Sequence, residues 1–177
     1  MMARKKRTEK PKPAPLNALK EKPEQIEHTK LFLDPHKIEL ASIVSQKATI
    51  NDIALVALST NRADSVGDAP FKIEIVLKSN GFGIDKEQNR LTVRPVLSVS
   101  AFKQAADTSQ SEPVISIQAT FGLLYDCESL AEVPPENLAA FANTNAIFNL
   151  WPFWRELVLS ISTRMRATPI IIPLLRV

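Results

Sequence analysis

The histidines and cysteines, the side chains most typical of zinc sites and of nucleophile–base pairs, are few and widely spaced in this 177-residue chain. His28 and His36 are the only histidines, with seven residues between them. Cys127 is the only cysteine, whereas a structural zinc site takes four imidazole, thiolate or carboxylate ligands at close spacing. We therefore interpret Cys127 as a small, semi-buried residue, and we expect no bound metal.

Two other patterns that can carry chemistry also point away from catalysis. Arg155 and Glu156 are adjacent, and adjacent residues of a helix do not face each other, so each should pair elsewhere or be solvated. The glycines form no phosphate-binding loop, and Gly81 and Gly83 are better interpreted as a hairpin turn. No GxSxG motif is present. We expect a protein that is not an enzyme and that needs no cofactor.

The chain divides into a basic tail and a body. With 45% hydrophobic and 23% charged residues, the composition is that of one globular domain with a core. Residues 1–22 hold eight Lys and Arg against two Glu. Residues 1–30 contain four prolines and bury too little apolar surface to offset their ordering entropy. We predict a disordered basic tail over 1–30 and one domain over 31–177.

A basic tail suggests either a solvated arm or contact with nucleic acid. No aromatic residue is interleaved among its charges, and no nucleic-acid-binding motif follows it. We prefer the solvated arm and do not expect nucleic acid as a partner. No apolar run is long enough for a secretory signal or a membrane span, and one cysteine fits a reducing compartment. The expected location is cytoplasmic, without membrane insertion.

The body begins with two ambiguous segments and continues with clearer strands. The apolar residues of 38–49 fit a strand with a bulge, although a short helix is also compatible. The apolar run 53–58 fits either form, and 61–70 is typical of a loop. Apolar and polar residues then alternate in 71–78 and in 114–127, which is the pattern of strands with one buried face.

A further strand is predicted over 91–100, where Pro95 suggests an edge strand or a bulge because it lacks a ladder donor. The segment 79–85 supplies turn residues. Successive strands with short connections indicate an antiparallel sheet.

The period becomes helical over 135–165, and the chain then extends. Pro135 suits a helix start, and Pro152 should either kink one long helix or begin a second helix. Thr168 and Pro169 should end the helical segment. Residues 169–175, here called the C-terminal arm, place three isoleucines between two prolines and should be extended. Strands followed by a kinked helix define an α+β fold.

The helix and the arm carry more apolar side chains than one core can use. Residues 150–154 cover the whole circumference of a helix, since each step turns about 100°. In an extended arm, consecutive isoleucines make both faces apolar. Such elements imply a subunit interface, a surface for another polypeptide, or both. The candidate residues are Leu150, Trp151, Phe153, Trp154, Leu157, Ile170, Ile171, Ile172 and Leu174.

The heptapeptide LWPFWRE at 150–156 resembles the signature helix of the SecB preprotein-export chaperones and their SecB-like relatives. The Pro-bounded aliphatic arm that follows is also similar, as is the spacing of Ile38, Leu40, Ile43 and Val44 to the family's first strand. The resemblance covers roughly residues 35–175. It implies a four-stranded antiparallel sheet packed by the helix, and a homotetramer built as a dimer of dimers. It also implies holdase activity, the ATP-independent binding of unfolded polypeptides, without a cofactor.

Two departures from the family favour a specialised chaperone. SecB proper continues into a second C-terminal helix and an acidic tail that binds the SecA motor, whereas this sequence ends at Val177 and its tail is basic. We therefore expect a fold without that second helix. We expect a dedicated client, such as the antitoxin of a toxin–antitoxin module. General preprotein export is the alternative, and a nucleic-acid-associated adaptor acting through residues 1–22 is an alternative of another class.

Overall fold

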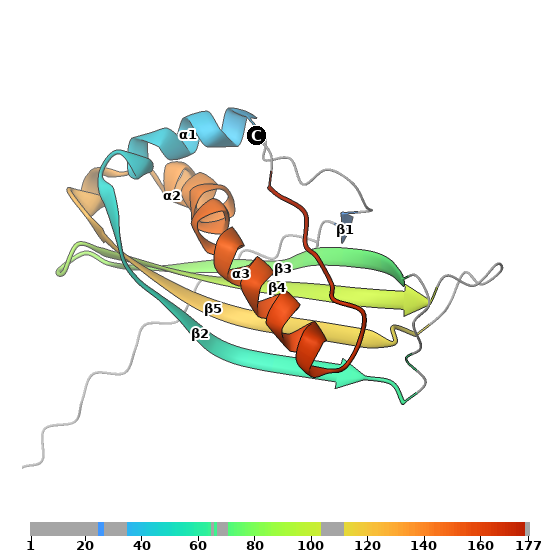
Figure 1. The fold of residues 1–177 in the computed structure, drawn as a ribbon. Coiled ribbons are helices and arrows are strands. Elements are labelled where there is room, and N and C mark those ends of the chain that lie inside the picture. The colour runs from blue at the N-terminus through green and yellow to red at the C-terminus, as the bar shows by residue number, and fades with distance from the viewer. Residues whose placement is uncertain (1–24, 27–34, 65, 67–70, 104–111, 176–177) are drawn as a thin grey trace, which may run out of the picture.

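A computed structural model describes residues 25–26, 35–64, 66, 71–103 and 112–175 of the chain. These residues form an antiparallel sheet with helices over one face (Figure 1). The α+β prediction is confirmed. The elements are β1 Gln25–Ile26, α1 Pro35–Ser45, β2 Ala48–Arg62, β3 Phe71–Asp85, β4 Arg90–Lys103, β5 Ile115–Cys127, a 3-10 turn at Leu130–Glu132, α2 Pro135–Asn143 and α3 Asn145–Arg164.

The sheet has the strand order β1-β3-β4-β5-β2, with all neighbours antiparallel. The four long strands were predicted in part, and the two-residue β1 was not. β5 follows its predicted alternation closely: every second residue from Ile115 to Cys127 is buried, and the residues that alternate with them are half-buried except for the exposed Asp126. The predicted basic tail lies outside the described residues except for β1, which pairs with β3.

The first described helix occupies a segment for which we had also considered a strand. Residues 35–45 form α1, so the strand-with-bulge alternative for 38–49, and the likeness to a SecB first strand there, are wrong. Ala41 and Val44 are fully buried, and Leu40 packs partly against the core, which is helical spacing. The amide of Asn137 in α2 donates to the Leu40 carbonyl at 2.7 Å and ties the two helices together. The first long strand is β2, which absorbs 53–58 and the start of the predicted loop 61–70.

The predicted hairpin turn at Gly81 and Gly83 is also wrong, because β3 continues to Asp85 in register with β4. The turn comes four residues later. The Asp85 carboxylate accepts the backbone N–H groups of Glu87 and Gln88 at 3.1 and 3.0 Å, and Asn89 takes the left-handed conformation with φ 52°. Asp readily accepts hydrogen bonds from backbone N–H groups two or three residues later, and Asn tolerates the left-handed conformation. The turn is therefore formed by Asp85 and Asn89 and not by the glycines.

Pro95 lies in β4, which is an interior strand, so the edge-strand interpretation is wrong. The ladder between β4 and β5 runs from the pair Val93–Leu123 to the pair Val96–Thr120, with no pairing recorded at Arg94 or Pro95. On the other side, the register of β3 shifts between Leu77 and Ser79, one step from the Pro95 pair. The missing donor of Pro95 therefore coincides with the interruption of the β4–β5 ladder, while its pairing with Asn80 of β3 is kept.

Two helices, and not one, cover the sheet, and the break is at Thr144 with φ −126° and ψ −78°. Its hydroxyl donates to the Ala140 carbonyl at 2.7 Å. Pro135 begins α2 as predicted. Pro152 lies inside α3, so of the two alternatives for Pro152 the kinked helix is confirmed and the second helix start is wrong. The proline costs α3 one hydrogen bond to the preceding turn, while Trp151 and Trp154 on either side of it are buried.

The helix α3 ends earlier than Thr168, in a Schellman motif centred on Arg166. Arg166 has φ 51°, and its backbone N–H donates to the Thr163 carbonyl. The backbone N–H of Ala167 donates to the Ser162 carbonyl. The chain reverses there. In Figure 1 the C-terminal arm runs back alongside α3, on the side of β3. No helix occurs between Arg166 and Leu175, the last described residue.

Candidate functional site

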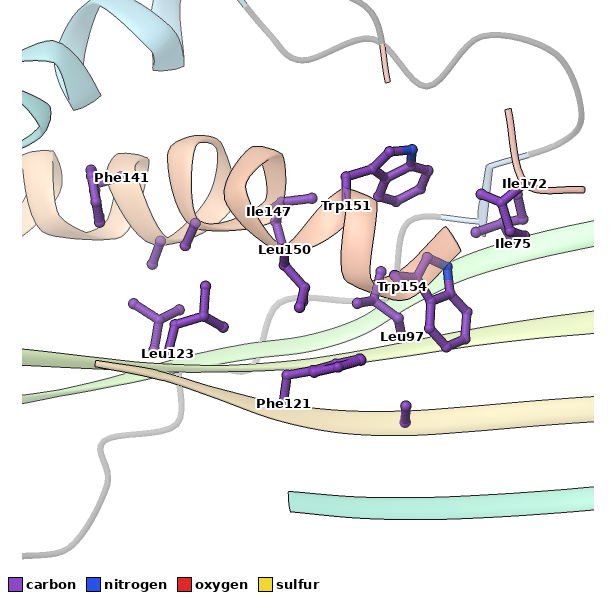
Figure 2. Close-up of a cluster of buried hydrophobic side chains, with 14 of the residues drawn as sticks. Ile75, Leu97, Phe121, Leu123, Phe141, Ile147, Leu150, Trp151, Trp154 and Ile172 are labelled. Atoms are coloured by element: carbon purple, nitrogen blue, oxygen red, sulfur yellow. The ribbon is translucent and has the colours of Figure 1, made fainter. Parts of the chain in front are cut away.

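Helix α3 presents three kinds of surface. Leu150, Trp154 and Val158 are fully buried on its sheet side, and Figure 2 shows Leu150 and Trp154 directed toward the strands that carry Leu97 and Phe121. Trp151 points to another side, away from the sheet (Figure 2). The remaining side is exposed, and we call its apolar residues the outer helix face: Phe148, Pro152, Phe153 and Leu159, with the exposed Glu156 among them.

The two tryptophans of the LWPFWRE segment have different surroundings. Trp154 has no exposed surface, and its indole Nε1 has no acceptor among the described residues. Trp151 is 4% exposed, and its Nε1 donates to the Pro173 carbonyl at 2.9 Å. Trp154 is thus a sheet-facing core residue, whereas Trp151 contacts the C-terminal arm. Phe153 is the aromatic residue of this turn that is left half-exposed, at 50%.

The C-terminal arm alternates between buried and exposed side chains, as an extended chain does. Ile170 and Ile172 are 3% and 1% exposed, whereas Ile171 is 75% and Leu174 is 64% exposed. Figure 2 shows Ile172 near Ile75 of β3, and all of these buried residues belong to one apolar cluster. The arm therefore extends the core with one face and offers an apolar face to its surroundings.

Three hydrogen bonds between α3 and the arm hold the arm in place. The Trp151 indole donates to Pro173 O, and the Nε of Arg155 donates to Ile172 O at 2.8 Å. The backbone N–H of Ile170 donates to the Ser162 hydroxyl at 3.0 Å. The arm has no ladder of backbone bonds to a strand. Arg155 therefore pairs with the arm and not with Glu156, as expected from their adjacency in the helix.

A second apolar surface lies on β2, one of the two edge strands of the described sheet. Two register shifts, between Ile50 and Asp52 and between Leu55 and Ala57, keep its apolar residues on one face. Opposite residues of an antiparallel pair share a face, and these residues oppose inward-facing residues of β5, such as Phe121 opposite Leu55. The strand is nevertheless exposed along almost its whole length. We call these residues the β2 strip: Ile50, Ile53, Leu55 and Leu58.

Among the described residues, the ionisable groups with shifted pKa values are Tyr125 and Cys127, which lie in the core. Burial raises the pKa of Tyr125 to about 12, opposed by a hydrogen bond from Asn149 and assisted by Cys127. Burial, with the neighbouring Asp126, also raises the pKa of Cys127, which favours the unreactive thiol. Tyr125 packs edge-on against Phe141 with ring centroids 5.0 Å apart. Both residues are structural.

Within the described ranges, no group of three or more His, Cys, Asp or Glu is placed to hold a metal ion. The helices in the same ranges are too short or too polar to cross a membrane.

The candidate residues from the sequence fall into two places. Phe153, Ile171 and Leu174 are exposed and Leu157 is half-buried, while the others are buried within the chain: Leu150, Trp151, Trp154, Ile170 and Ile172. Sequence reasoning missed Phe148 and Leu159, although their spacing to Pro152 of four and seven residues marks one helical face. It also missed the β2 strip, which two bulges conceal from a period-two pattern, and the arm-holding role of Arg155.

No protein-family model matches the chain, and no curated protein matches its sequence. A solved structure does: the SecB-like chaperone Rv1957 of Mycobacterium tuberculosis in complex with a ChAD peptide from the Rv1956 HigA1 antitoxin. The two chains are 20% identical, with a TM-score of 0.68, and the match covers 81% of this chain and 100% of that chain. The fold of this protein is therefore SecB-like, as the LWPFWRE segment predicted.

Proposed function

We propose that this protein is a SecB-like, ATP-independent chaperone that holds an unfolded polypeptide, with an antitoxin-like protein as its dedicated client. The observation that carries the proposal is the apolar surface left open on the outer helix face and the arm. Phe148, Phe153, Ile171 and Leu174 are each at least half-exposed. A patch of large apolar side chains on a soluble fold is typical of a protein-binding surface. The antitoxin peptide bound to Rv1957 supports the client class.

An apolar surface of this type should bind the client reversibly and not permanently. Burial of about 1,000 Å² of apolar surface contributes roughly 25 kcal/mol before costs. Ordering an unfolded client and fixing it on the chaperone offset most of that sum. Binding is then reversible and tolerant of sequence, because extended client segments dock through alternate apolar side chains and backbone groups.

The second apolar surface suits self-association. An exposed edge strand with unpaired backbone groups pairs readily with another strand, and β2 adds the β2 strip to that edge. We propose that β2 meets β2 of another copy, in a homo-oligomer that reaches a dimer of dimers. The cytoplasm is the compartment that goes with this proposal, since the single cysteine fits a reducing environment.

Suppression of antitoxin aggregation tests the function. A HigA1-type antitoxin diluted from denaturant should scatter less light when the full chain is present, without added nucleotide. General preprotein export predicts the same protection for unrelated secretory precursors, so a panel of precursors separates the two chaperone roles. Undiminished scattering with every client would contradict the proposal.

A chain lacking residues 1–22 separates the chaperone from the nucleic-acid adaptor. The chaperone proposal expects protection to survive the deletion. Loss of all protection, together with salt-dependent DNA binding by the intact chain alone, would favour the adaptor.

A further inference from the structure

We propose that Trp151 and Arg155 form a clamp for polypeptide backbone, that the C-terminal arm fills this clamp in the free protein, and that a client binds by taking the arm's place. The inference rests on the proposed chaperone function and assigns its regulation. It starts from the atoms that hold the arm. Trp151 Nε1 and Arg155 Nε donate to the carbonyl oxygens of Pro173 and Ile172, at 2.9 and 2.8 Å.

These two acceptors are consecutive backbone carbonyls. Successive carbonyls of a flat strand point to opposite sides, so both can face α3 only where the backbone of the occupant bends, as it does at Ile172 and Pro173. Because every residue carries a carbonyl, the clamp selects this backbone shape and not particular side chains. Both donors come from one turn of α3, four residues apart, and therefore keep a fixed relation to each other. A pair of fixed donors for carbonyl oxygens suits an extended segment whose backbone can take the same local bend.

The side chains beneath the clamp also fit an interchangeable occupant. Ile170 and Ile172 are buried, and Ile171 between them is exposed. The site thus takes apolar side chains at alternate positions, which is what an extended, hydrophobic client segment supplies. The class of partner is an extended polypeptide with large apolar residues at i and i+2.

The attachment of the arm is weak enough to be exchanged. Apart from the clamp, its described polar contact with α3 is the N–H of Ile170 on the Ser162 hydroxyl, and it joins no strand. Pro169 and Pro173 lack the N–H groups that a strand ladder needs. Burial of two isoleucines works against the entropy of ordering the whole segment. A client then gains apparent affinity in proportion to the fraction of molecules with the arm released.

The first test compares client affinities of full-length variants. The probe is reduced, carboxymethylated lactalbumin, a chain that cannot refold, carrying a dye for anisotropy. Ile172→Ser removes the buried anchor of the arm and should tighten binding about threefold to tenfold. Ile43→Ser, the same change at an exposed site of α1, is the matched control and should shift the dissociation constant less than twofold. Adding Arg155→Met to Ile172→Ser should weaken binding about tenfold, because the client loses a donor.

The second test observes the arm directly. A fluorophore that tryptophan quenches on contact is attached at Leu174→Cys, next to the Pro173 carbonyl that Trp151 holds. Saturating lactalbumin should restore emission with the same midpoint as binding. Binding with emission still quenched, or an Ile172→Ser affinity equal to that of the unmodified chain, would overturn the clamp while leaving the chaperone function intact. Absence of binding in every variant would overturn both.

Discussion

The indole N–H of Trp151 donates to the backbone carbonyl of Pro173, twenty-two residues later in the chain, at 2.9 Å. This bond joins the LWPFWRE segment of α3 to the C-terminal arm, and it distinguishes Trp151 from Trp154. Trp154 lies on the sheet side of the same helix with an unpartnered Nε1 among the described residues.

Trp151→Phe should loosen the arm, because phenylalanine keeps an aromatic ring, although a smaller one, and loses the hydrogen-bond donor. A hydrogen bond of this kind contributes about 0.5–1.5 kcal/mol, so amide exchange in residues 170–175 should become roughly threefold to tenfold faster. Mass-spectrometric hydrogen exchange on native protein measures it. Trp154→Phe is the matched control and should leave exchange in the arm unchanged. Equal acceleration in both variants would indicate that ring volume, and not the hydrogen bond, holds the arm.

Arg166→Gly should stabilise the fold by about 0.5–1 kcal/mol. Arg166 occupies the left-handed position of the Schellman motif with φ 51°, where glycine avoids the Cβ penalty. Arg164→Gly, two residues earlier inside α3, should instead destabilise by about 1 kcal/mol, because it lowers helix propensity. Urea unfolding of both variants gives the comparison. A loss of stability in Arg166→Gly would mean that the arginine side chain outweighs the backbone strain.

Tyr125 should show a pH-dependent contribution to stability above pH 10. It is the only tyrosine of the chain, so absorbance at high pH reports its ionisation alone. Burial raises its pKa to about 12 in the folded state, against about 10 unfolded. The unfolded chain then loses the proton first, and the stabilising difference is fully present below pH 10 and disappears between pH 10 and 12.

The loss through this pH interval should be on the order of 1–2 kcal/mol. Denaturant unfolding at pH 9 and at pH 11.5, for the unmodified chain and for Tyr125→Phe, isolates it. The phenylalanine variant should lose less stability across the interval. Identical pH dependence of the two proteins would mean that folding does not raise the pKa of Tyr125, and would contradict its burial in the core.

Charges in the β2 strip should reduce self-association without unfolding the protomer. Leu55→Lys combined with Leu58→Lys introduces two like charges on an exposed apolar face of the edge strand. Sedimentation should report a smaller species than the unmodified protein forms. Ser59→Lys, on the opposite face of the same strand, is the control and should preserve the assembly. Unchanged sedimentation of the double variant would exclude β2 as the interface.

The parts of the fold with an uninterrupted period could be predicted from the sequence. β5 alternates over its whole length, and the prolines at 134 and 135 mark the start of α2. The predictions were wrong where a short-range pattern was ambiguous. Residues 38–49 carry too few apolar residues to distinguish a helix from a bulged strand, and α1 is fixed by packing on α2. The glycines of 79–85 suggested a turn that Asp85 and Asn89 supply instead.

The candidate site could be predicted only as a region. An apolar excess over 150–154 and in the arm is visible in composition, but which side chain faces which surface depends on the rotation of α3. The hydrogen bonds of Trp151 and Arg155 go to backbone carbonyls, and these partners leave no pattern in a sequence. The β2 strip was missed because two bulges reset its alternation.

The most direct measurement of the proposed chaperone activity is a titration of dye-labelled, reduced and carboxymethylated lactalbumin with the full chain, followed by anisotropy. Binding should saturate without nucleotide. It should weaken at least tenfold when Phe148→Ser and Phe153→Ser replace the two half-exposed phenylalanines of the outer helix face. Absence of saturable binding, or equal affinity of this double variant and the unmodified protein, would contradict a chaperone that holds its client on this surface.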